Sequence, residues 1–243
     1  MTGLVRIVLI DPSHPGNIGS VARAMKNMNL EDLVLVRPRS FPHAEASALA
    51  AGADDLLAAA RVVTTVAAAV ADCALIAGTT SRPRSHSWEF ATPRDAAGRI
   101  AALAAHTRAA LLFGSERYGL ATEDLQYCNL LVRIPANPAY CSLNLAMSVQ
   151  LLAYEIFIAR EAPATQIQRD APLAESAAME YFYAHLDEVL REIAFEDRTG
   201  HLMERLRRLF NRAQLDDNEL NILRGILGAV QGKRGRAARK SGR

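Results

Sequence analysis

The stretch that decides the fold is Leu111–Glu155, which reads LLFGSERYGLATEDLQYCNLLVRIPANPAYCSLNLAMSVQLLAYE. Two apolar segments within it, Leu111–Phe113 and Leu130–Ile134, have the composition of buried strands. Gly114 follows the first segment and Pro135 the second, and the chain then enters a strongly apolar helix. Strands that end in such residues just before a helix are typical of the ligand crevice of an α/β protein. We therefore expect a ligand site where these two strands end.

Outward from this stretch, the first 160 residues alternate apolar strands with helical patterns. The remaining strands are expected at Arg6–Ile10, Leu33–Val36 and Cys73–Ala77. This alternation predicts a parallel α/β sheet. The helices are expected at Ile18–Met28, at Ala44–Ala60 with an interruption near Gly52, at Val66–Ala71 and at Pro93–Ala105.

The character of the chain changes after residue 160. Glu161–Pro172 carries prolines and shows no periodicity, which indicates a linker. Three stretches with apolar residues at helical spacing follow, and Asp216 and Glu219 resemble a capping box before the third. We expect an α/β domain over 1–160, a linker over 161–174, a small all-α extension over 175–232 and a basic tail over 233–243. In each of the three stretches the apolar residues form a stripe along one side of the expected helix. The stripes are Met179, Phe182, Leu186, Val189, Leu190 and Ile193, then Leu202, Leu206, Leu209 and Phe210, and finally Leu220, Leu223, Ile226, Leu227 and Val230.

Charge and composition narrow the class of protein. The net charge of the 243 residues is +2, but Lys233–Arg243 holds six basic residues and no acidic one. The rest of the chain has 22 basic and 26 acidic residues. Such a tail suits either a polyanionic partner or a solubilising role. Because the chain has no apolar run of 18 residues and no signal-like N-terminus, we expect a cytoplasmic protein without a membrane span.

The cysteines and histidines do not predict a metal site. Cys73, Cys128 and Cys141 form no C-x-x-C pair, so a reduced intracellular chain without bound metal is expected. His14 and His86 have no carboxylate paired with them in the sequence, and we expect neither to be catalytic.

Three motifs resemble those of the SPOUT methyltransferases, knotted enzymes that use S-adenosylmethionine (SAM). Ser13–Met28 (SHPGNIGSVARAMKNM) resembles their first motif, Phe113–Leu120 (FGSERYGL) the second and Ile134–Glu155 the third. The motifs occur in the family's order and spacing. The resemblance is greatest to the TrmJ type, which methylates the 2′-hydroxyl of nucleotide 32 in the tRNA anticodon loop. It runs from Arg6 to about Tyr154 and resumes at Leu206–Leu227.

The resemblance implies a parallel-sheet SPOUT fold with a C-terminal trefoil knot, formed as a homodimer whose active sites draw on both subunits. Knotted chains are very rare, so only the resemblance supports the knot. It also implies SAM-dependent 2′-O-methylation of cytidine, uridine or both, with tRNA as the partner. The apolar helix of the third motif is a candidate dimer element, and the sheet is the alternative partner for its residues Leu143, Met147, Leu151 and Tyr154.

Five polar residues match motif positions near the family's reacting centre: Asn17, Arg23, Glu116, Ser142 and Asn144. Arg23 is implied to act on the target hydroxyl, either as the base or by orienting it. A guanidinium is a poor base but a good bidentate phosphate ligand, so both roles stay open. For Glu116 we expect an orienting role through hydrogen bonds. Each residue also has a purely structural alternative. Arg23 would be an exposed helix arginine, and Glu116 would form a surface ion pair with a neighbouring arginine. The other three, Asn17, Ser142 and Asn144, would cap helices.

The resemblance further implies which positions hold SAM, largely through their backbone groups: Thr79, Thr80, Ser81, Gly114, Ile134, Cys141, Ser142 and Leu143. All of them follow expected strands. The family usually has Ser where this chain has Cys141, and a contact through the backbone tolerates that difference.

Basic residues in two regions are candidates for RNA contacts. Arg82 and Arg84 lie in a polar loop with Trp88, which can stack on a base or pack in the core. Arg205, Arg208 and Arg212 share one face of an expected helix.

Two functions from other classes fit parts of the sequence. A SAM-independent RNA-binding protein on the same fold is opposed by the intact motif residues. A nucleotide-binding oxidoreductase is suggested by the first strand, turn and helix alone, and the chain lacks the G-x-G-x-x-G fingerprint.

Overall fold

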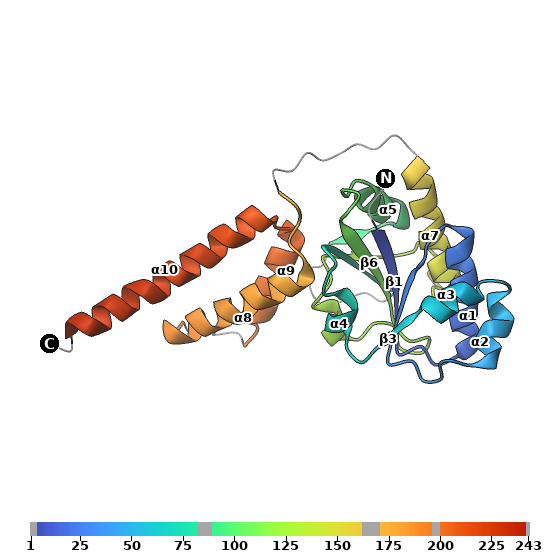
Figure 1. The fold of residues 1–243 in the computed structure, drawn as a ribbon, viewed down its shortest axis with the longest axis horizontal. Helices are drawn as coiled ribbons and strands as arrows, with labels where there is room; N and C mark the ends of the chain where they lie inside the picture. Colours follow the sequence, from blue (N-terminus) through green and yellow to red (C-terminus); the bar gives the residue numbers. More distant parts are fainter. Residues whose placement is uncertain (1–3, 82–88, 162–170, 196–199, 242–243) are drawn as a thin grey trace.

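The computed structural model describes residues 4–81, 89–161, 171–195 and 200–241, with backbone alone from residue 233 (Figure 1). Up to Glu161 the chain forms one seven-stranded sheet with helices on both faces. The strands are β1 (Leu4–Ile10), β2 (Asp32–Val36), β3 (Arg61–Val63), β4 (Leu75–Thr79), β5 (Phe90–Ala91), β6 (Arg108–Phe113) and β7 (Leu130–Val132). The helices of this part are α1 (Pro15–Asn27), α2 (Ala44–Ala50), α3 (Asp54–Ala59), α4 (Val66–Val70), α5 (Pro93–Ala101), α6 (Thr122–Leu125) and α7 (Leu145–Glu161).

The sheet confirms the predicted α/β class. Its strand order is β3-β2-β1-β6-β4-β7-β5, and every neighbouring pair is parallel. The carboxyl ends of β4, β6 and β7 therefore meet at one edge of the sheet. β7 is the last strand in the sequence, but in the sheet it lies between β4 and β5.

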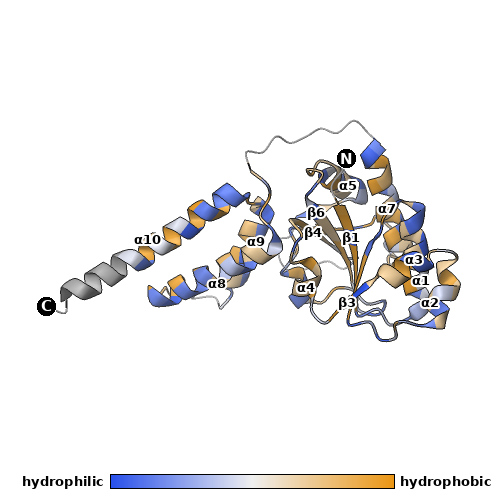
Figure 2. Cartoon of the chain, in the orientation of Figure 1, coloured by the Kyte–Doolittle hydropathy of each residue, from blue (hydrophilic) through white to orange (hydrophobic). Residues whose placement is uncertain are grey.

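Both faces of the sheet are buried, which explains why its strands read as continuous apolar runs. In β1, Ile7 and Leu9 face one core with α1, α2, α3, α5 and α7, whereas Val8 and Ile10 face a second core with α4 and α6. Figure 2 shows strands that are mainly hydrophobic, and helices that carry both hydrophobic and hydrophilic residues.

The helix of the third motif, α7, has two apolar faces. Val149, Leu152 and Ile156 are fully buried against the sheet and against α1 and α5. On the other side, Met147, Leu151, Tyr154 and Ile158 are each at least 42% exposed. The sheet is therefore not the partner of Met147, Leu151 and Tyr154, and this outer stripe has no cover within the described residues.

Three helices are described after residue 171, at the three predicted stretches: α8 (Ser176–Glu192), α9 (Leu202–Ala213) and α10 (Asp217–Ser241). They enclose a small core that includes Met179, Phe182 and Leu220. The capping box before α10 is confirmed, because the Asp216 N–H donates to Glu219 Oε2 at 3.0 Å and the Glu219 N–H donates to Asp216 Oδ1 at 2.8 Å. The backbone of the basic segment continues α10 as far as Ser241.

Three residues of the predicted helical stripes are exposed to solvent. Ile193, Leu209 and Ile226 are exposed, although their spacing matches that of their buried neighbours. A bundle of three short helices covers only a narrow strip of each helix, so apolar residues at the margin of a stripe stay in water.

The C-terminal helices pack against the α/β part beside the amino ends of β4 and β7. The Ser176 N–H donates to the Cys73 carbonyl at 2.9 Å, just before β4 begins. The buried side chain of Asn211 on α9 donates to the Gln126 carbonyl at 3.0 Å and accepts from the Tyr183 hydroxyl at 2.7 Å. In return, the Asn129 amide donates to the Asn211 carbonyl at 3.2 Å. Polar contacts thus fix where α8 and α9 sit against the α/β part, while the far end of α10 points away from it (Figure 1).

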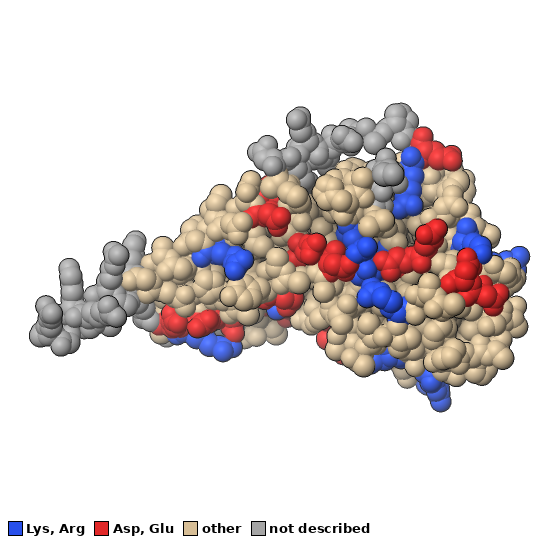
Figure 3. Space-filling view, viewed as in Figure 1, with Lys and Arg blue, Asp and Glu red and all other residues tan. Residues whose placement is uncertain are grey.

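Charged side chains are sparse on the face drawn in Figure 3. Among the side chains that the structure describes, basic and acidic groups are interspersed there, without a large area of one sign. No helix within the described ranges is long and apolar enough to cross a membrane.

Candidate functional site

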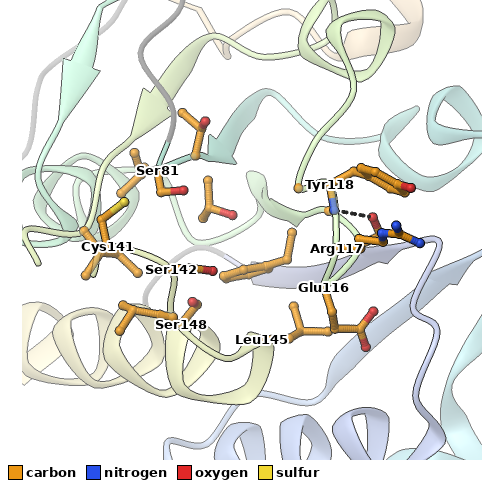
Figure 4. Close-up of a pocket in the computed structure, with 17 residues that line it drawn as sticks. Ser81, Glu116, Arg117, Tyr118, Cys141, Ser142, Leu145 and Ser148 are labelled. Carbon is orange, nitrogen blue, oxygen red and sulfur yellow. Dashed lines mark hydrogen bonds between the residues drawn. The ribbon is translucent and has the colours of Figure 1, made fainter. Parts of the chain in front are cut away.

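A pocket with a volume of about 290 Å³ lies at the carboxyl ends of β4, β6 and β7 (Figure 4). Its floor is apolar, with Phe113, Val132 and Leu145, and its walls are short polar loops. All eight positions predicted to hold the cofactor line it: Thr79, Thr80, Ser81, Gly114, Ile134, Cys141, Ser142 and Leu143. Sequence positions from three separate loops therefore meet in one cavity.

The loop after β6 closes tightly on itself and forms one wall of the pocket. The Gly119 N–H donates to the Ser115 carbonyl at 2.8 Å, and the Tyr118 N–H donates to the Ser115 hydroxyl at 3.3 Å. A Cβ on Gly114 would lie 2.0 Å from the Gly119 carbonyl carbon, so position 114 has no room for a side chain. Gly119 itself has a φ of 67°, in the left-handed region that favours glycine.

Glu116 lies in this loop and accepts hydrogen bonds from the start of α1. Its Oε2 accepts from the Ser13 N–H at 3.0 Å and from the Ser13 hydroxyl at 2.8 Å. Its Oε1 accepts from the Asn17 amide at 2.9 Å and from the His14 N–H at 3.3 Å. Burial alone would raise the pKa of the Glu116 carboxyl, but the hydrogen bonds from Asn17 and Ser13 lower it to about 2. Glu116 is therefore an anion at neutral pH, and within the described residues its partners are hydrogen-bond donors at the start of α1 and not a neighbouring arginine.

Asn17 connects the first motif to the third. While its amide nitrogen donates to Glu116, its Oδ1 accepts from the Asn144 amide at 3.1 Å. Asn144 in turn caps α7, because its Oδ1 accepts from the Ala146 N–H at 2.8 Å. The capping role is thus confirmed for Asn144 and is wrong for Asn17. Asn17 belongs to the first turn of α1, which begins at Pro15, and its side chain bonds to Glu116 and Asn144 instead of capping the helix.

The five predicted reacting-centre residues are only partly brought together. Glu116 and Ser142 line the pocket, and Asn17 and Asn144 stand behind Glu116 in the hydrogen-bonded chain. Arg23 is exposed on α1, six residues beyond Asn17 and so about 9 Å further along the helix axis. Within the described part of one chain, Arg23 does not line the pocket.

The predicted RNA contacts divide by region. Arg82 and Arg84, together with Trp88 and His86, lie outside the described residues. On α9, Arg205 and Arg212 are exposed and Arg208 is half-buried. The neighbouring Arg207 has a structural role instead, because it pairs with Glu180 at 2.6 Å and lies over the Tyr183 ring.

Sequence reasoning missed several residues of the pocket wall. Arg117 and Tyr118 occupy the same tight loop as Glu116, and Ser148 lies in the first turns of α7. The two glycines that bracket the loop were the signal for the first two residues, since closure between Gly114 and Gly119 forces every residue between them to the rim. Nothing in the sequence marks Ser148.

Comparison with known proteins identifies this arrangement. The model of the SpoU rRNA Methylase family matches residues 4–154, and that of the C-terminal domain of the tRNA methyltransferase TrmJ matches residues 177–242. The chain is 46% identical over 235 residues to the tRNA (cytidine/uridine-2′-O-)-methyltransferase TrmJ of Escherichia coli (strain K12), which covers 93% of this chain and 95% of that protein.

Solved structures agree. The crystal structure of TrmJ from Z. mobilis ZM4 has a TM-score of 0.82 and 36% identity, and the match covers 94% of this chain and 100% of that one. The SpoU methyltransferase AviRb from Streptomyces viridochromogenes, in complex with the cofactor AdoMet, shares the fold at a TM-score of 0.54 and 20% identity, over 67% of this chain and 63% of that one. The chain therefore belongs to the SpoU methylase family, among its TrmJ-type members, and is a methyltransferase.

Proposed function

We propose that this protein transfers a methyl group from SAM to the 2′-hydroxyl of cytidine or uridine in tRNA, at position 32 of the anticodon loop. The observation that carries the proposal is the pocket at the ends of β4, β6 and β7, in which all eight expected cofactor positions meet beside the ionised Glu116. The TrmJ relative supports the substrate class, since its name specifies cytidine and uridine in tRNA.

The residues of the pocket fit SAM. The apolar floor of Phe113, Val132 and Leu145 suits an adenine ring, and the backbone groups of the three loops suit its polar edge and the amino-acid part. When bound, SAM supplies an electrophilic methyl group on a positively charged sulfonium. The described residues contain no group of three or more His, Cys, Asp or Glu side chains that could hold a metal ion. We therefore propose that the cofactor binds through protein groups alone.

Glu116 orients the site and does not exchange protons at neutral pH. A carboxyl with a pKa of about 2 stays ionised, and hydrogen bonds from Ser13, His14 and Asn17 occupy both its oxygens. It holds Asn17, and through it Asn144 and the start of α7, in a fixed position around the pocket. Ser142 lines the pocket directly and is proposed to contact the cofactor and the target ribose.

We propose that Arg23 acts on the ribose held at the pocket of a second copy of the chain. It is exposed on α1, beside α7, and lies away from the pocket of its own chain. The exposed stripe Met147, Leu151, Tyr154 and Ile158 on α7 is the proposed dimer contact. In that place Arg23 orients the hydroxyl and binds the adjacent phosphate, for which a guanidinium is well suited.

The proposal extends to topology and domains. The position of β7 between β4 and β5 supports a trefoil knot in the segment that carries the third motif. We propose a catalytic domain over 1–160, a linker over 161–174 and a helical module from residue 175 that docks tRNA through Arg205, Arg208, Arg212 and the basic end of α10, with Arg82 and Arg84 contacting RNA near the pocket. An enzyme for tRNA is expected in the cytoplasm.

One assay tests the function. The protein is incubated with methyl-labelled SAM and bulk tRNA in excess chelator, and the tRNA is digested to nucleosides and mapped. Label in 2′-O-methylcytidine or 2′-O-methyluridine from position 32 is expected. RNA binding without transfer would favour the SAM-independent RNA-binding alternative, and transfer that requires added magnesium would contradict the metal-free site.

A further inference from the structure

Tyr140 stands out at the mouth of the pocket. Its side chain is 80% exposed, the highest value among the exposed large hydrophobic residues in the described ranges. The two residues that follow it, Cys141 and Ser142, both line the pocket. Because two residues span at most about 7 Å, the ring is held close to the pocket mouth.

The segment that carries Tyr140 is held in place. The Tyr140 N–H donates to the Asn137 carbonyl at 2.9 Å, and the Ala139 N–H donates to Asn137 Oδ1 at 2.9 Å. Pro135 and Pro138 restrict the backbone on either side of Asn137. The backbone of this segment is therefore fixed, and the Tyr140 side chain that it carries is exposed to solvent.

The rim on the other side of the pocket also presents an aromatic ring. Tyr118 is 60% exposed, and the Arg117 guanidinium carbon lies 5.1 Å from the centre of its ring. Figure 4 shows Tyr118 and Arg117 across the pocket from Cys141. Tyr118 and Arg117 thus line one side of the pocket, and the exposed Tyr140 directly precedes the residues that line the other side.

Unpaired RNA bases are the ligand that this rim fits. Sequence-specific proteins bind single-stranded RNA loops by stacking splayed bases on Tyr, Phe, Trp or Arg, and such stacking tolerates any base. A protein ligand would need a larger continuous apolar surface, whereas the neighbours of Tyr140 in the sequence include Asn137, Pro138 and the pocket residues Cys141 and Ser142. An anion alone would not need an aromatic ring.

We propose that Tyr140 stacks on the base of the nucleotide whose ribose is methylated, and thereby holds that ribose over the pocket. This inference rests on the proposed function, since it requires a ribose as the acceptor. Stacking needs the ring and not its hydroxyl group. Tyr140→Phe is therefore the matched control for Tyr140→Ala.

The test compares binding of two RNAs by three proteins. The RNAs are a tRNA transcript and the same transcript with an abasic residue at the methylated position. Tyr140→Ala should bind the intact transcript about 5- to 100-fold more weakly than the wild type does. It should bind the abasic transcript as the wild type does, because the base on which the ring would stack is already absent. Tyr140→Phe should match the wild type on both RNAs, and all three proteins should bind SAM equally well by calorimetry.

Other outcomes would overturn the inference. An equal loss of affinity for both RNAs would give Tyr140 a contact outside the target base. Weakened SAM binding would make it a cofactor residue, and a changed mass in solution would make it an interface residue. Failure of the wild type to methylate any tRNA would instead count against the proposed function, because the comparison of the two RNAs measures binding and does not depend on turnover.

Discussion

Glu116 is the residue at which three distant segments of the chain meet. It bonds to Ser13 and Asn17, which are about 100 residues away in the sequence. Asn17 in turn accepts a hydrogen bond from Asn144. A charged acceptor makes stronger hydrogen bonds than a neutral one, and Glu116 accepts four of them. The geometry of the pocket therefore depends on one carboxylate that has no proton to give at neutral pH.

Replacing Glu116 by Gln should reduce stability in a way that depends on pH. The folded-state pKa of about 2 lies below the unfolded value, so the ionised carboxylate stabilises the fold above about pH 5 and loses this effect as the pH falls towards 2. Allowing for solvent screening of this half-exposed group, we expect a loss of about 1–2 kcal/mol at neutral pH.

The measurement is urea unfolding of wild type and Glu116→Gln between about pH 3 and 7. The difference in unfolding free energy should shrink towards the acid end. Glu123→Gln, at an exposed position on α6, is the control and should show no such trend. A difference that stays constant with pH would mean that Gln disturbs packing and not charge.

Arg23→Ala should lower the methyl-transfer rate by at least about a hundredfold, the size of effect seen when one stabilising donor at a reacting centre is removed. SAM affinity should stay close to wild type, because the proposed contacts of Arg23 are with the target ribose and its phosphate and not with the cofactor. Arg23→Lys should recover little, since an ammonium cannot bind bidentately. Single-turnover rates and calorimetry measure the two quantities, and a parallel loss of SAM affinity would place Arg23 in the cofactor site.

At the scale of the elements, the sequence predicts the sheet well and the helix margins poorly. Strands buried on both faces are apolar throughout, so the predicted β1, β2 and β4 agree with the structure within about two residues at their ends. Periodicity does not show which apolar residues have a neighbour to cover them, and Leu209 and Ile226, which lie on the predicted stripes, are exposed.

The cofactor positions of the site could be predicted from the sequence, because they lie in loops that directly follow strands and turn-forming residues mark such loops. The use of Asn17 could not be predicted, because its partners Glu116 and Asn144 are 99 and 127 residues away. Only the folded sheet brings such residues together. The strand order that does so is not encoded in local pattern.

The exposed stripe on α7 leads to a prediction about assembly. Leu151→Asp should convert a dimer into a monomer with an intact fold, because Leu151 already faces water in the single chain and a charge there opposes apolar contact. Light scattering after size exclusion measures the mass. Ile222→Asp on α10, also exposed, should leave the mass unchanged. An unaltered dimer in the Leu151 variant would exclude this face of α7 as the interface.

Asn211→Ala should loosen α8 and α9 from the sheet. It removes the side chain that bonds to the Tyr183 hydroxyl and the Gln126 carbonyl, at an expected cost of about 1–3 kcal/mol, while the hydroxyl keeps its 3.4 Å hydrogen bond to the Arg207 carbonyl. Hydrogen exchange should rise in α8 and α9 and stay unchanged in β1 and β6. The exposed Asn218→Ala is the control. Equal exchange in both variants would show that this junction does not set the docking.

In the whole molecule, the C-terminal helices lie at the amino ends of the strands and the pocket lies at their carboxyl ends. Cys73, which contacts α8, precedes Thr79 in the pocket by six residues, a distance of about 20 Å along an extended strand. The described charges form no large basic area on the face drawn in Figure 3. Lys233–Arg243 holds six basic residues, whereas the rest of the chain has 22 basic and 26 acidic residues, so electrostatic affinity for tRNA is expected mainly from the basic end of α10 together with the arginines of α9.

Truncation separates these contributions. A chain that ends at Ala164 should fold, form a dimer and bind SAM, but bind tRNA much more weakly. Each phosphate that the protein no longer neutralises should make the slope of log K against log salt shallower by roughly 0.7–0.9. Filter binding across a salt series measures this, with a chain ending at Gly232 to isolate the basic end. Unchanged affinity and slope in the shorter chain would make the helical module a structural cover.

The place of β7 has a consequence for the order in which the protein is built. β5 has β7 as its only strand neighbour among the described strands, and β7 is made some 40 residues later. This edge of the sheet must therefore wait, unpaired, until the chain beyond residue 130 has left the ribosome and entered the space between β4 and β5. Contacts between such distant segments form slowly. The pocket is thus the last part of the α/β domain to form, and the earlier strands of a nascent chain can become compact well before the chain can bind its cofactor.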